Sequence, residues 1–365
     1  MPIDLPPGHF FLPGPTEVHP DVLAAQARPM IGHRGRAIEE LLAELQVGLQ
    51  RVFVTERPVI VSTSSATGLM EAAVRNGVAG GKVLSLVNGA FSSRFGEIAM
   101  ACGHDTEVWP VDWGLFHDPE ELDERLARGG FDAVTITHSE TSTGALQDLG
   151  AIARVTGSHE GVMLLVDSVT GVAGAEVRTD DWGLDFVLTG SQKALALPPG
   201  LAFAVASPEL LDRSAQATNK GYYFDLLPLI KSLEAFQTPS TPAISLLYAL
   251  EVQLERILAE GIEQRWGRHV AMQQATSDWV DAMQADGIDV GVLAPPGHRS
   301  PTVTCITLPE GISGTSVVAA MRESGWVIGG GYSRLKESTI RIGHMGDHRP
   351  EVLSELLESL GRVLR

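Results

Sequence analysis

The chain has 365 residues, of which 44% are hydrophobic and 20% are charged, and its formal net charge is −18. This composition is typical of a globular protein with a large core and excludes a disordered chain. The acidic balance, together with the lack of any run of five basic residues, argues against nucleic acid or an anionic membrane as a partner.

The N-terminal segment through Pro29 is rich in proline, and we expect it to be irregular and to pack on the rest of the protein. It has no basic region followed by a long apolar stretch, so no signal peptide is expected. No apolar run in the chain is long enough to span a bilayer. The two cysteines, Cys102 and Cys305, form no metal-binding pattern. We therefore expect no metal site and a cytoplasmic location.

Between residues 59 and 207 the sequence alternates between short apolar runs and stretches with helical periodicity. Runs that are apolar throughout are typical of strands covered on both faces. We expect strands at residues 58–63, 82–88, 106–111, 132–138, 162–168, 185–190 and 201–207, and helices at 65–78, 92–103, 118–129 and 149–157. This order predicts a mostly parallel, seven-stranded sheet sandwiched between helices, with its ligand at the carboxyl ends of the strands.

Residues 208–260 have helical character, and the pattern changes after Gly261. A helix to about residue 286 is followed by two strand-like runs, 301–311 and 338–346, and by helices at 313–325 and 349–364. We therefore expect a smaller C-terminal α+β domain. The predicted division is an N-terminal segment of residues 1–14, a large domain of 15–258 and a small domain of 259–365.

Several polar or aromatic residues follow the predicted strands and would meet at one edge of the sheet. Ser65, Ala66 and Thr67 begin a helix and could bind an anion, although serine and threonine are also ordinary helix caps. Phe91 either lies beside the same crevice or is a core aromatic residue. Thr141 could reach a ligand, or it could belong to a polar helix start.

Asp167 ends one apolar run, and Lys193 follows the next run in the stretch SQKALALPPG. A buried carboxylate and a lone ammonium group are costly unless they are paired or neutralised. A simple ion pair would explain both charges, but not the anion site and the hydroxyl cluster. Pyridoxal 5′-phosphate would explain all of them, because it needs a lysine, a carboxylate, an anion site and an apolar ring face.

These residues stand in familiar motifs. The stretches FLPGPTEVHP, SSATGLMEAAV, NGAFSSRF, HSETSTGAL, LLVDSVTG, GSQKALALPPG, TPSTPAISL and TIRIGHMG span nearly the whole chain. In them the chain resembles the class V aminotransferases of pyridoxal-phosphate fold type I, close to the alanine–glyoxylate and serine–pyruvate aminotransferases. The resemblance implies transamination of a small α-amino acid, alanine or serine, with glyoxylate or pyruvate.

The resemblance also implies roles for residues of this chain. Lys193 matches the lysine that forms the internal aldimine, and Asp167 matches the partner of the ring nitrogen. The other residues that match cofactor contacts are Ser65, Ala66, Thr67, Phe91, Thr141, Val169 and Gln192 and, from the neighbouring subunit of a homodimer, Ser240 and Thr241. In the animal alanine–glyoxylate enzymes the position of Phe91 is tryptophan.

Substrate contacts are implied for Arg341, which matches the arginine that binds the α-carboxylate, and for Gly14. His33 and Arg34 lie where a related His-Arg pair binds the distal anion in phosphoserine aminotransferases. They either favour an aspartate-like or phosphorylated donor, or form a loop in which the arginine pairs with Glu39 or Glu40. A lyase or desulfurase of the same fold, or a non-catalytic protein, is the remaining alternative, although a desulfurase needs a mobile, exposed cysteine.

Overall fold

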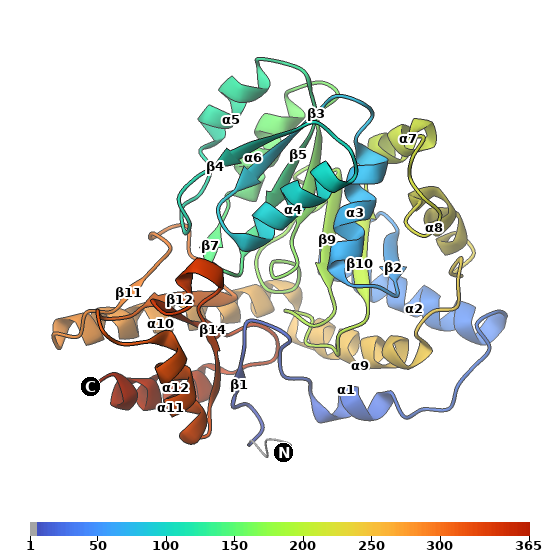
Figure 1. Ribbon diagram of the computed structural model, residues 1–365. Coiled ribbons are helices and arrows are strands. Elements are labelled where there is room, and N and C mark those ends of the chain that lie inside the picture. Colours follow the sequence, from blue (N-terminus) through green and yellow to red (C-terminus); the bar gives the residue numbers. More distant parts are fainter. Residues whose placement is uncertain (1–5) are drawn as a thin grey trace.

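The computed structural model describes residues 6–365, and a seven-stranded sheet lies at its centre (Figure 1). Each strand coincides with one of the seven predicted runs. In sheet order the strands are β2 (Val59–Ser62), β10 (Ala202–Ala206), β9 (Phe186–Gly190), β8 (Met163–Asp167), β5 (Phe131–Thr137), β3 (Lys82–Val87) and β4 (Thr106–Pro110). Only β10 is antiparallel to its neighbours, so the other six strands end at the same edge.

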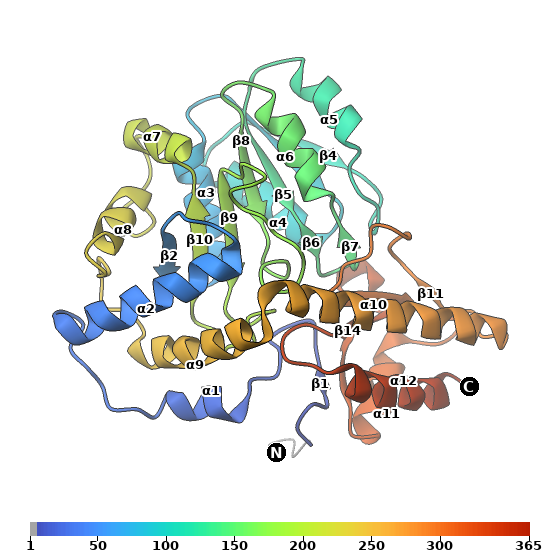
Figure 2. The same cartoon turned by 180° about the vertical axis from the view of Figure 1, so that it is seen from behind.

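Side chains alternate between the two faces of this sheet and divide the core into two layers. Ile60 of β2 packs in one hydrophobic cluster, whereas its neighbours Val59 and Val61 pack in the other. The helices over the Ile60 face are α3 (Ala66–Gly77), α4 (Ala90–Ala101), α7 (Pro208–Gln216) and α8 (Leu226–Leu233). The opposite face, turned forward in Figure 2, is covered by α2 (Arg36–Phe53), α5 (Pro119–Leu126), α6 (Leu149–Gly157) and α9 (Ile244–Glu260).

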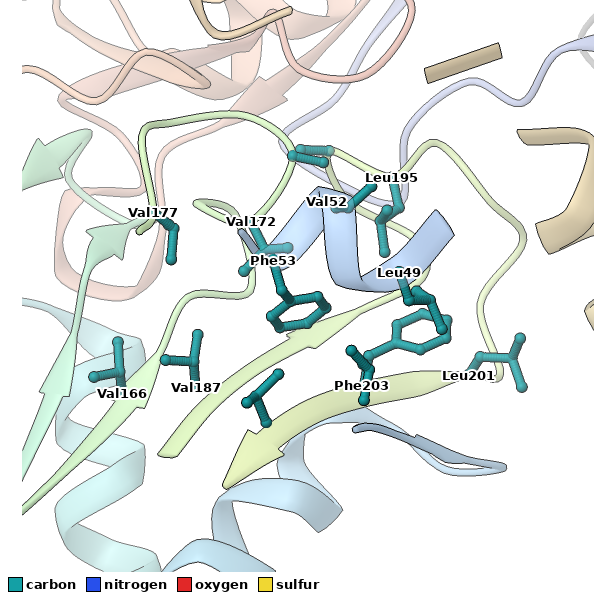
Figure 3. Close-up of a cluster of buried hydrophobic side chains, with 14 of the residues drawn as sticks. Leu49, Val52, Phe53, Val166, Val172, Val177, Val187, Leu195, Leu201 and Phe203 are labelled. Atoms are coloured by element: carbon teal, nitrogen blue, oxygen red, sulfur yellow. The ribbon is translucent and has the colours of Figure 1, made fainter. Parts of the chain in front are cut away.

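The cluster on the Val59 face joins the longest of these helices to the middle of the sheet. Figure 3 shows Leu49 and Phe53 of α2 directed toward the strands that carry Phe203 (β10) and Val187 (β9), and Val52 next to Leu195. These side chains are fully buried. The packing fixes the sheet against its helices and so holds the carboxyl edge in a defined shape.

A side chain of α2 forms hydrogen bonds with the free backbone edge of strand β2. The amide of Gln46 in α2 donates to the Val59 carbonyl at 2.7 Å and accepts from the Val59 N–H at 2.9 Å. An exposed strand edge has unpaired backbone groups that can template aggregation. Gln46 satisfies both groups at this position and ties α2 to the sheet.

A second sheet of five strands builds the smaller domain. Its order is β1 (Phe10–Phe11), β13 (Val327–Gly330), β14 (Thr339–Gly343), β12 (Val303–Thr307) and β11 (Gly291–Val292). The helices α10 (Ile262–Ala285), α11 (Gly314–Glu323) and α12 (Pro350–Leu364) contribute to its core. The long helix α10 runs along the junction with the large sheet (Figure 2). The predicted domain limits at residues 14 and 258 stay predictions.

Arg265, near the start of α10, links the two parts through buried contacts. Its guanidinium donates to the carbonyl of Ala194, which directly follows Lys193, and pairs with Asp347 at 2.9 Å and Glu260 at 2.8 Å. Asp347 lies just after β14, the strand that carries Arg341. The loop after Lys193 and the end of the Arg341 strand therefore share one anchor.

The N-terminal segment is more regular than the sequence analysis predicted. Residues 10–11 form β1, which pairs in parallel with Val327 and Ile328 of β13, and α1 (Pro20–Ala25) follows. The prediction of an irregular segment through Pro29 was therefore wrong, because β13 and the large domain supply partners that the sequence alone does not show. The first five residues of the predicted segment 1–14 lie outside the described residues.

Three smaller features complete the chain. Residues 139–146 form a short hairpin of β6 (Ser139–Glu140) and β7 (Ala145–Leu146), and a 3₁₀ helix, η1 (Ser333–Leu335), lies between β13 and β14. No helix within residues 6–365 combines the length and apolar character needed to cross a membrane.

Candidate active site

A cavity of about 150 Å³ lies at the carboxyl edge of the large sheet. Nine residues singled out from the sequence line it: Ser65, Ala66, Thr67, Phe91, Thr141, Asp167, Val169, Gln192 and Lys193. Four more residues line it that the sequence analysis did not select: Met70, Arg94, Thr137 and Ser139. Strand ends and helix starts that are far apart in sequence therefore converge on one space, as parallel topology requires.

Lys193 lies in this cavity on the loop between β9 and β10. Its ammonium donates to the carbonyl of Pro13 at 2.6 Å, and no carboxylate of the described chain lies within ion-pair distance. Burial, followed by the positive charge of Arg341, lowers the pKa of Lys193 to about 8, and the charge of Asp167 offsets this only in part. A lysine in this environment is neutral in a large fraction of molecules near pH 8.

Gly14 lies directly against that lysine. Its φ of +103° belongs to the region that favours glycine, and a Cβ at this position would collide with Nζ, Cε and Cδ of Lys193. Any side chain at position 14 would therefore displace the lysine. Gly14 thus lies against Lys193 but is not among the residues that line the cavity.

Asp167 ends β8 and is buried, with only 2% of its surface exposed. It accepts hydrogen bonds from the Val169 N–H at 2.9 Å and from the Thr137 hydroxyl at 3.3 Å. Burial is the main cause that raises the pKa of Asp167 to about 7, and these two bonds only partly oppose it. Within residues 6–365 this carboxylate forms no ion pair, so it is suited to a positively charged ligand.

The start of α3 leaves backbone donors open to the same cavity. Its N-cap residue, Ser65, makes no side-chain capping bond, in contrast to Asp118, Asp148 and Ser207, which cap α5, α6 and α7. The first N–H groups of a helix need partners, and its dipole favours an anion. An uncapped helix that begins at a cavity is therefore suited to a phosphate group.

Phe91 is held at the cavity by a buried carboxylate. Glu140 of β6 is fully buried and accepts from the backbone N–H groups of Phe91 at 3.1 Å and Ser92 at 2.9 Å. It also accepts from the hydroxyls of Ser92 and Ser142. These bonds fix the first turn of α4, and with it the backbone of Phe91, against the loop that carries Thr141.

Arg341 lies in the middle of β14, behind Thr141. Its guanidinium donates to the Gly330 carbonyl at 2.8 Å and to the Thr141 carbonyl at 3.2 Å, and its Cζ is 5.4 Å from the ring centroid of Tyr332. Arg341 therefore contacts Thr141, which lines the cavity, but is not itself among the lining residues. It makes no ion pair among residues 6–365.

Four predicted residues lie away from this cavity. His33 and Arg34 are exposed, and Arg34 donates to the carbonyls of His33 and Pro239 and not to Glu39 or Glu40. The suggested Arg34 pairing was wrong because Arg36 takes Glu40 and Gln237 takes Glu39. Ser240 and Thr241 border a separate hollow together with Tyr222 and Tyr223.

Among the residues of the site that the sequence did not indicate, Arg94 and Tyr332 have contacts with Phe91. Arg94 follows Phe91 by three positions, so helical spacing alone puts the two on one face, and its Cζ is 4.9 Å from the Phe91 ring centroid. Tyr332 reaches the site from the small domain, and its ring centroid is 5.4 Å from that of Phe91. No local pattern indicates Tyr332, because its neighbours come from another domain.

The family model that matches this chain is that of an aminotransferase family, and the curated proteins that the chain resembles include aminotransferases. The family model of the class-V aminotransferases matches residues 17–343. An uncharacterized aminotransferase of Methanocaldococcus jannaschii is 38% identical over 351 residues, which cover 95% of this chain and 90% of that protein. The L-aspartate–glyoxylate aminotransferase of Paracoccus denitrificans is 32% identical (92% and 86% covered), and the serine–glyoxylate aminotransferase of Methylorubrum extorquens is 31% identical (93% and 86%).

The solved structures that this chain resembles include aminotransferases as well. An alanine–glyoxylate aminotransferase from Nostoc sp. superposes with a TM-score of 0.92 at 30% identity, over 100% of this chain and 97% of that one. An aspartate aminotransferase from Thermus thermophilus superposes with a TM-score of 0.88 at 33% identity, over 97% and 98%.

The buried carboxyl group gives a testable pH dependence. In the ligand-free chain the pKa of Asp167 rises from its ordinary value of 3.8 to about 7, so its protonated form is favoured by folding. This stability is fully present below pH 3.8 and is lost as the pH rises through 7. We expect the wild type to lose up to about 4 kcal/mol of unfolding free energy between pH 4 and pH 7, relative to Asp167→Asn.

Urea unfolding of both proteins across this pH range measures the difference. The exposed Asp289→Asn exchange is the matched control and should follow the wild type at every pH. A wild type that loses no more stability than Asp167→Asn would show that the buried carboxyl is already ionised at low pH.

Proposed function

The chain belongs to the class-V aminotransferase family, and we propose that it transfers the amino group of a small α-amino acid, alanine or serine, to glyoxylate or pyruvate. The observation that carries this proposal is the arrangement of Lys193 and Asp167. Both face one cavity, and neither forms an ion pair within residues 6–365, beside a helix start with open backbone donors. The names of the serine–glyoxylate and alanine–glyoxylate relatives support the choice of substrates.

The family works with pyridoxal 5′-phosphate, and the residues of the cavity fit this group. The uncapped start of α3, at Ser65, Ala66 and Thr67, suits its phosphate. The buried Asp167, with its raised pKa, suits a protonated ring nitrogen. A lysine with a lowered pKa suits an aldehyde, since only a neutral amine attacks it.

The remaining lining residues would hold the cofactor's other parts. Phe91 and Val169 offer apolar faces for the ring, and Thr141 and Gln192 offer polar atoms at its edge. Phenylalanine at position 91 offers less stacking area than tryptophan and no N–H donor. When bound, pyridoxal phosphate supplies an aldehyde for the donor amine and a ring that withdraws electrons from its α-carbon.

The chain's own residues then do three things. Lys193 would hold the aldehyde in the resting enzyme and, as a free amine at Nζ, would take the α-proton of the donor and later give a proton back. Asp167 would keep the ring nitrogen protonated. The positive charge on that nitrogen would in turn be the ion-pair partner that the buried carboxylate does not find within residues 6–365. Arg341 binds the α-carboxylate through two parallel hydrogen bonds and thereby orients the Cα–H bond.

Aspartate is the second candidate donor. His33 and Arg34, the basis for this alternative in the sequence, lie outside the cavity. Arg94, however, lines the cavity and forms no hydrogen bond or ion pair within residues 6–365, so it could take a distal carboxylate. The aspartate–glyoxylate relative supports the same reading.

A lyase or desulfurase reaction has less support. Cys305 is buried in β12, where burial raises the pKa of its thiol to about 11. Cys102 ends α4, and burial raises the pKa of its thiol as well. Neither lines the cavity, and a nucleophilic cysteine needs a low pKa and access to substrate.

A homodimer with shared active sites is part of the proposal. A hollow lined by Tyr222, Tyr223, Ser240 and Thr241 lies beside β2 and Thr63, on the surface next to the start of α3. Tyr222 is 94% exposed and Tyr223 is 51% exposed. Exposed aromatic side chains around a hollow are typical of an interface. In the dimer, Ser240 and Thr241 reach the phosphate of the neighbouring subunit.

The donor and acceptor are tested by half-reactions. Purified enzyme loaded with pyridoxal phosphate is mixed with alanine, serine or aspartate, and the change in cofactor absorbance is followed before glyoxylate or pyruvate is added. We expect alanine and serine to react fastest and glyoxylate or pyruvate to reverse the change. A chain that reacts only with aspartate would establish the second candidate, and one that reacts with no α-amino acid would contradict transamination.

The substrate clamp is tested by Arg341→Lys. The exchange keeps the charge but removes the two-pronged donor, so we expect KM for the amino donor to rise and kcat to fall, while pyridoxal phosphate still binds. The loss of a buried charged contact corresponds to about 2–5 kcal/mol, or roughly 30-fold to several-thousand-fold in kcat/KM. The exposed Arg322→Lys is the control. Unchanged kcat/KM for all three donors would remove Arg341 from the role.

The dimer is tested by light scattering combined with activity at increasing dilution. We expect a mass of two chains and a loss of activity when the subunits separate, because each cavity lacks the partner's Ser240 and Thr241. A monomer that keeps full activity would contradict shared active sites.

A further inference from the structure

Tyr332 borders the site through its contacts with Phe91 and Arg341, although it is not among the residues that line the cavity, and neither the family assignment nor the proposed function gives it a role. It lies in the loop after β13, just before η1. Its ring is 5.4 Å from that of Phe91, tilted by 40°, and the Arg341 guanidinium carbon is 5.4 Å from its centroid. At such distances rings and cation are in contact, with no gap for a side chain between them.

The other side of the reaction space is closed as well. The Pro13 carbonyl accepts from Lys193 at 2.6 Å, and the Gly14 backbone lies so close to that lysine that no Cβ fits. If the donor's carboxylate binds Arg341 and its α-carbon lies within reach of Lys193, the donor would lie between the backbone of Pro13 and Gly14 on one side and the rings of Phe91 and Tyr332 on the other.

We propose that Tyr332 is the wall that limits the length of the donor side chain to about that of alanine or serine. This inference rests on the proposed function, because it assumes that Arg341 binds the α-carboxylate. Three of the four groups on the α-carbon are then assigned: the carboxylate to Arg341, the amine to the cofactor and the proton to Lys193. The fourth, the side chain, points away from Lys193 and meets the ring pair.

As a limit on the donor side chain, Tyr332 would do more than hold the two domains together. A second such contact exists for comparison: Arg334 lies 4.2 Å from the ring centroid of Trp113, in a pair that includes neither Phe91 nor Arg341. Loss of either contact would loosen the junction between the domains. Only the loss of the Tyr332 ring would lengthen the space for the donor side chain.

The test uses a series of unbranched donors that differ by one methylene: alanine, 2-aminobutyrate and norvaline. In the wild-type holoenzyme we expect 2-aminobutyrate, whose side chain is as long as that of serine, to be accepted like alanine. At norvaline, which is one methylene longer, we expect kcat/KM to fall by about tenfold or more, the range for a pocket that rejects extra bulk. In Tyr332→Ala we expect norvaline to gain about tenfold or more relative to alanine. Tyr332→Leu serves if the alanine variant does not fold and should give a smaller gain.

Two control variants keep the wall. Tyr332→Phe retains the ring and should leave the ranking of donors unchanged. Arg334→Ala weakens the other contact between the domains and should lower or preserve all rates in the same proportion. A second readout is equilibrium binding of 2-methylalanine and 2-methylnorvaline, which have no α-proton and do not react. Their dissociation constants, measured by the shift in cofactor absorbance, should converge in Tyr332→Ala.

The inference is overturned if Tyr332→Ala and Tyr332→Leu keep the wild-type ranking of donors, or if all donors lose activity by one common factor. The second result would mean that Tyr332 only orients Arg341. A wild type that reacts with no donor contradicts the proposed function instead, and the binding of the two unreactive analogues still decides whether Tyr332 limits side-chain length.

Discussion

The burial of two ionisable groups without charged partners is the constraint on which this site depends. Asp167 and Lys193 lie in one cavity, yet within residues 6–365 neither forms an ion pair. Burial raises the pKa of the first to about 7 and lowers that of the second to about 8, so both charged forms are disfavoured. A fold that served only stability would gain by replacing them with apolar residues. A bound aldehyde with a basic ring nitrogen would provide a partner for both groups, the aldehyde for Lys193 and the nitrogen for Asp167.

The rest of the molecule can be understood as the support of this pair. The parallel sheet brings the ends of β8 and β9 together, and Glu140 ties the start of α4 to the loop that carries Thr141. The N-terminal segment crosses to the small sheet through β1 and lays Pro13 and Gly14 on Lys193. Arg265 connects the loop after Lys193 with Asp347 at the end of the Arg341 strand. Lysine and arginine are thus positioned by both domains.

The sequence predicted the large sheet well because its strands are buried on both faces and are apolar throughout. It also predicted most of the cavity, because parallel strands bring their carboxyl ends to one edge. It did not predict β13, whose residues VIGG are short and half glycine, or β1, which has two residues and exists only through its partner. Helix α2 was overlooked although Ile38, Leu41, Leu45 and Leu49 repeat with helical spacing. Tyr332 could not be found, because its role arises from a contact between domains.

The central claim is that Lys193 is the residue to which pyridoxal phosphate attaches. The most direct measurement is reduction of the holoenzyme with borohydride, followed by digestion and mass spectrometry of the labelled peptide. The account predicts one pyridoxyl group per chain, on Lys193, and none after Lys193→Ala. A label on another lysine of the loaded wild type, or a loaded enzyme that borohydride leaves unlabelled, would contradict it.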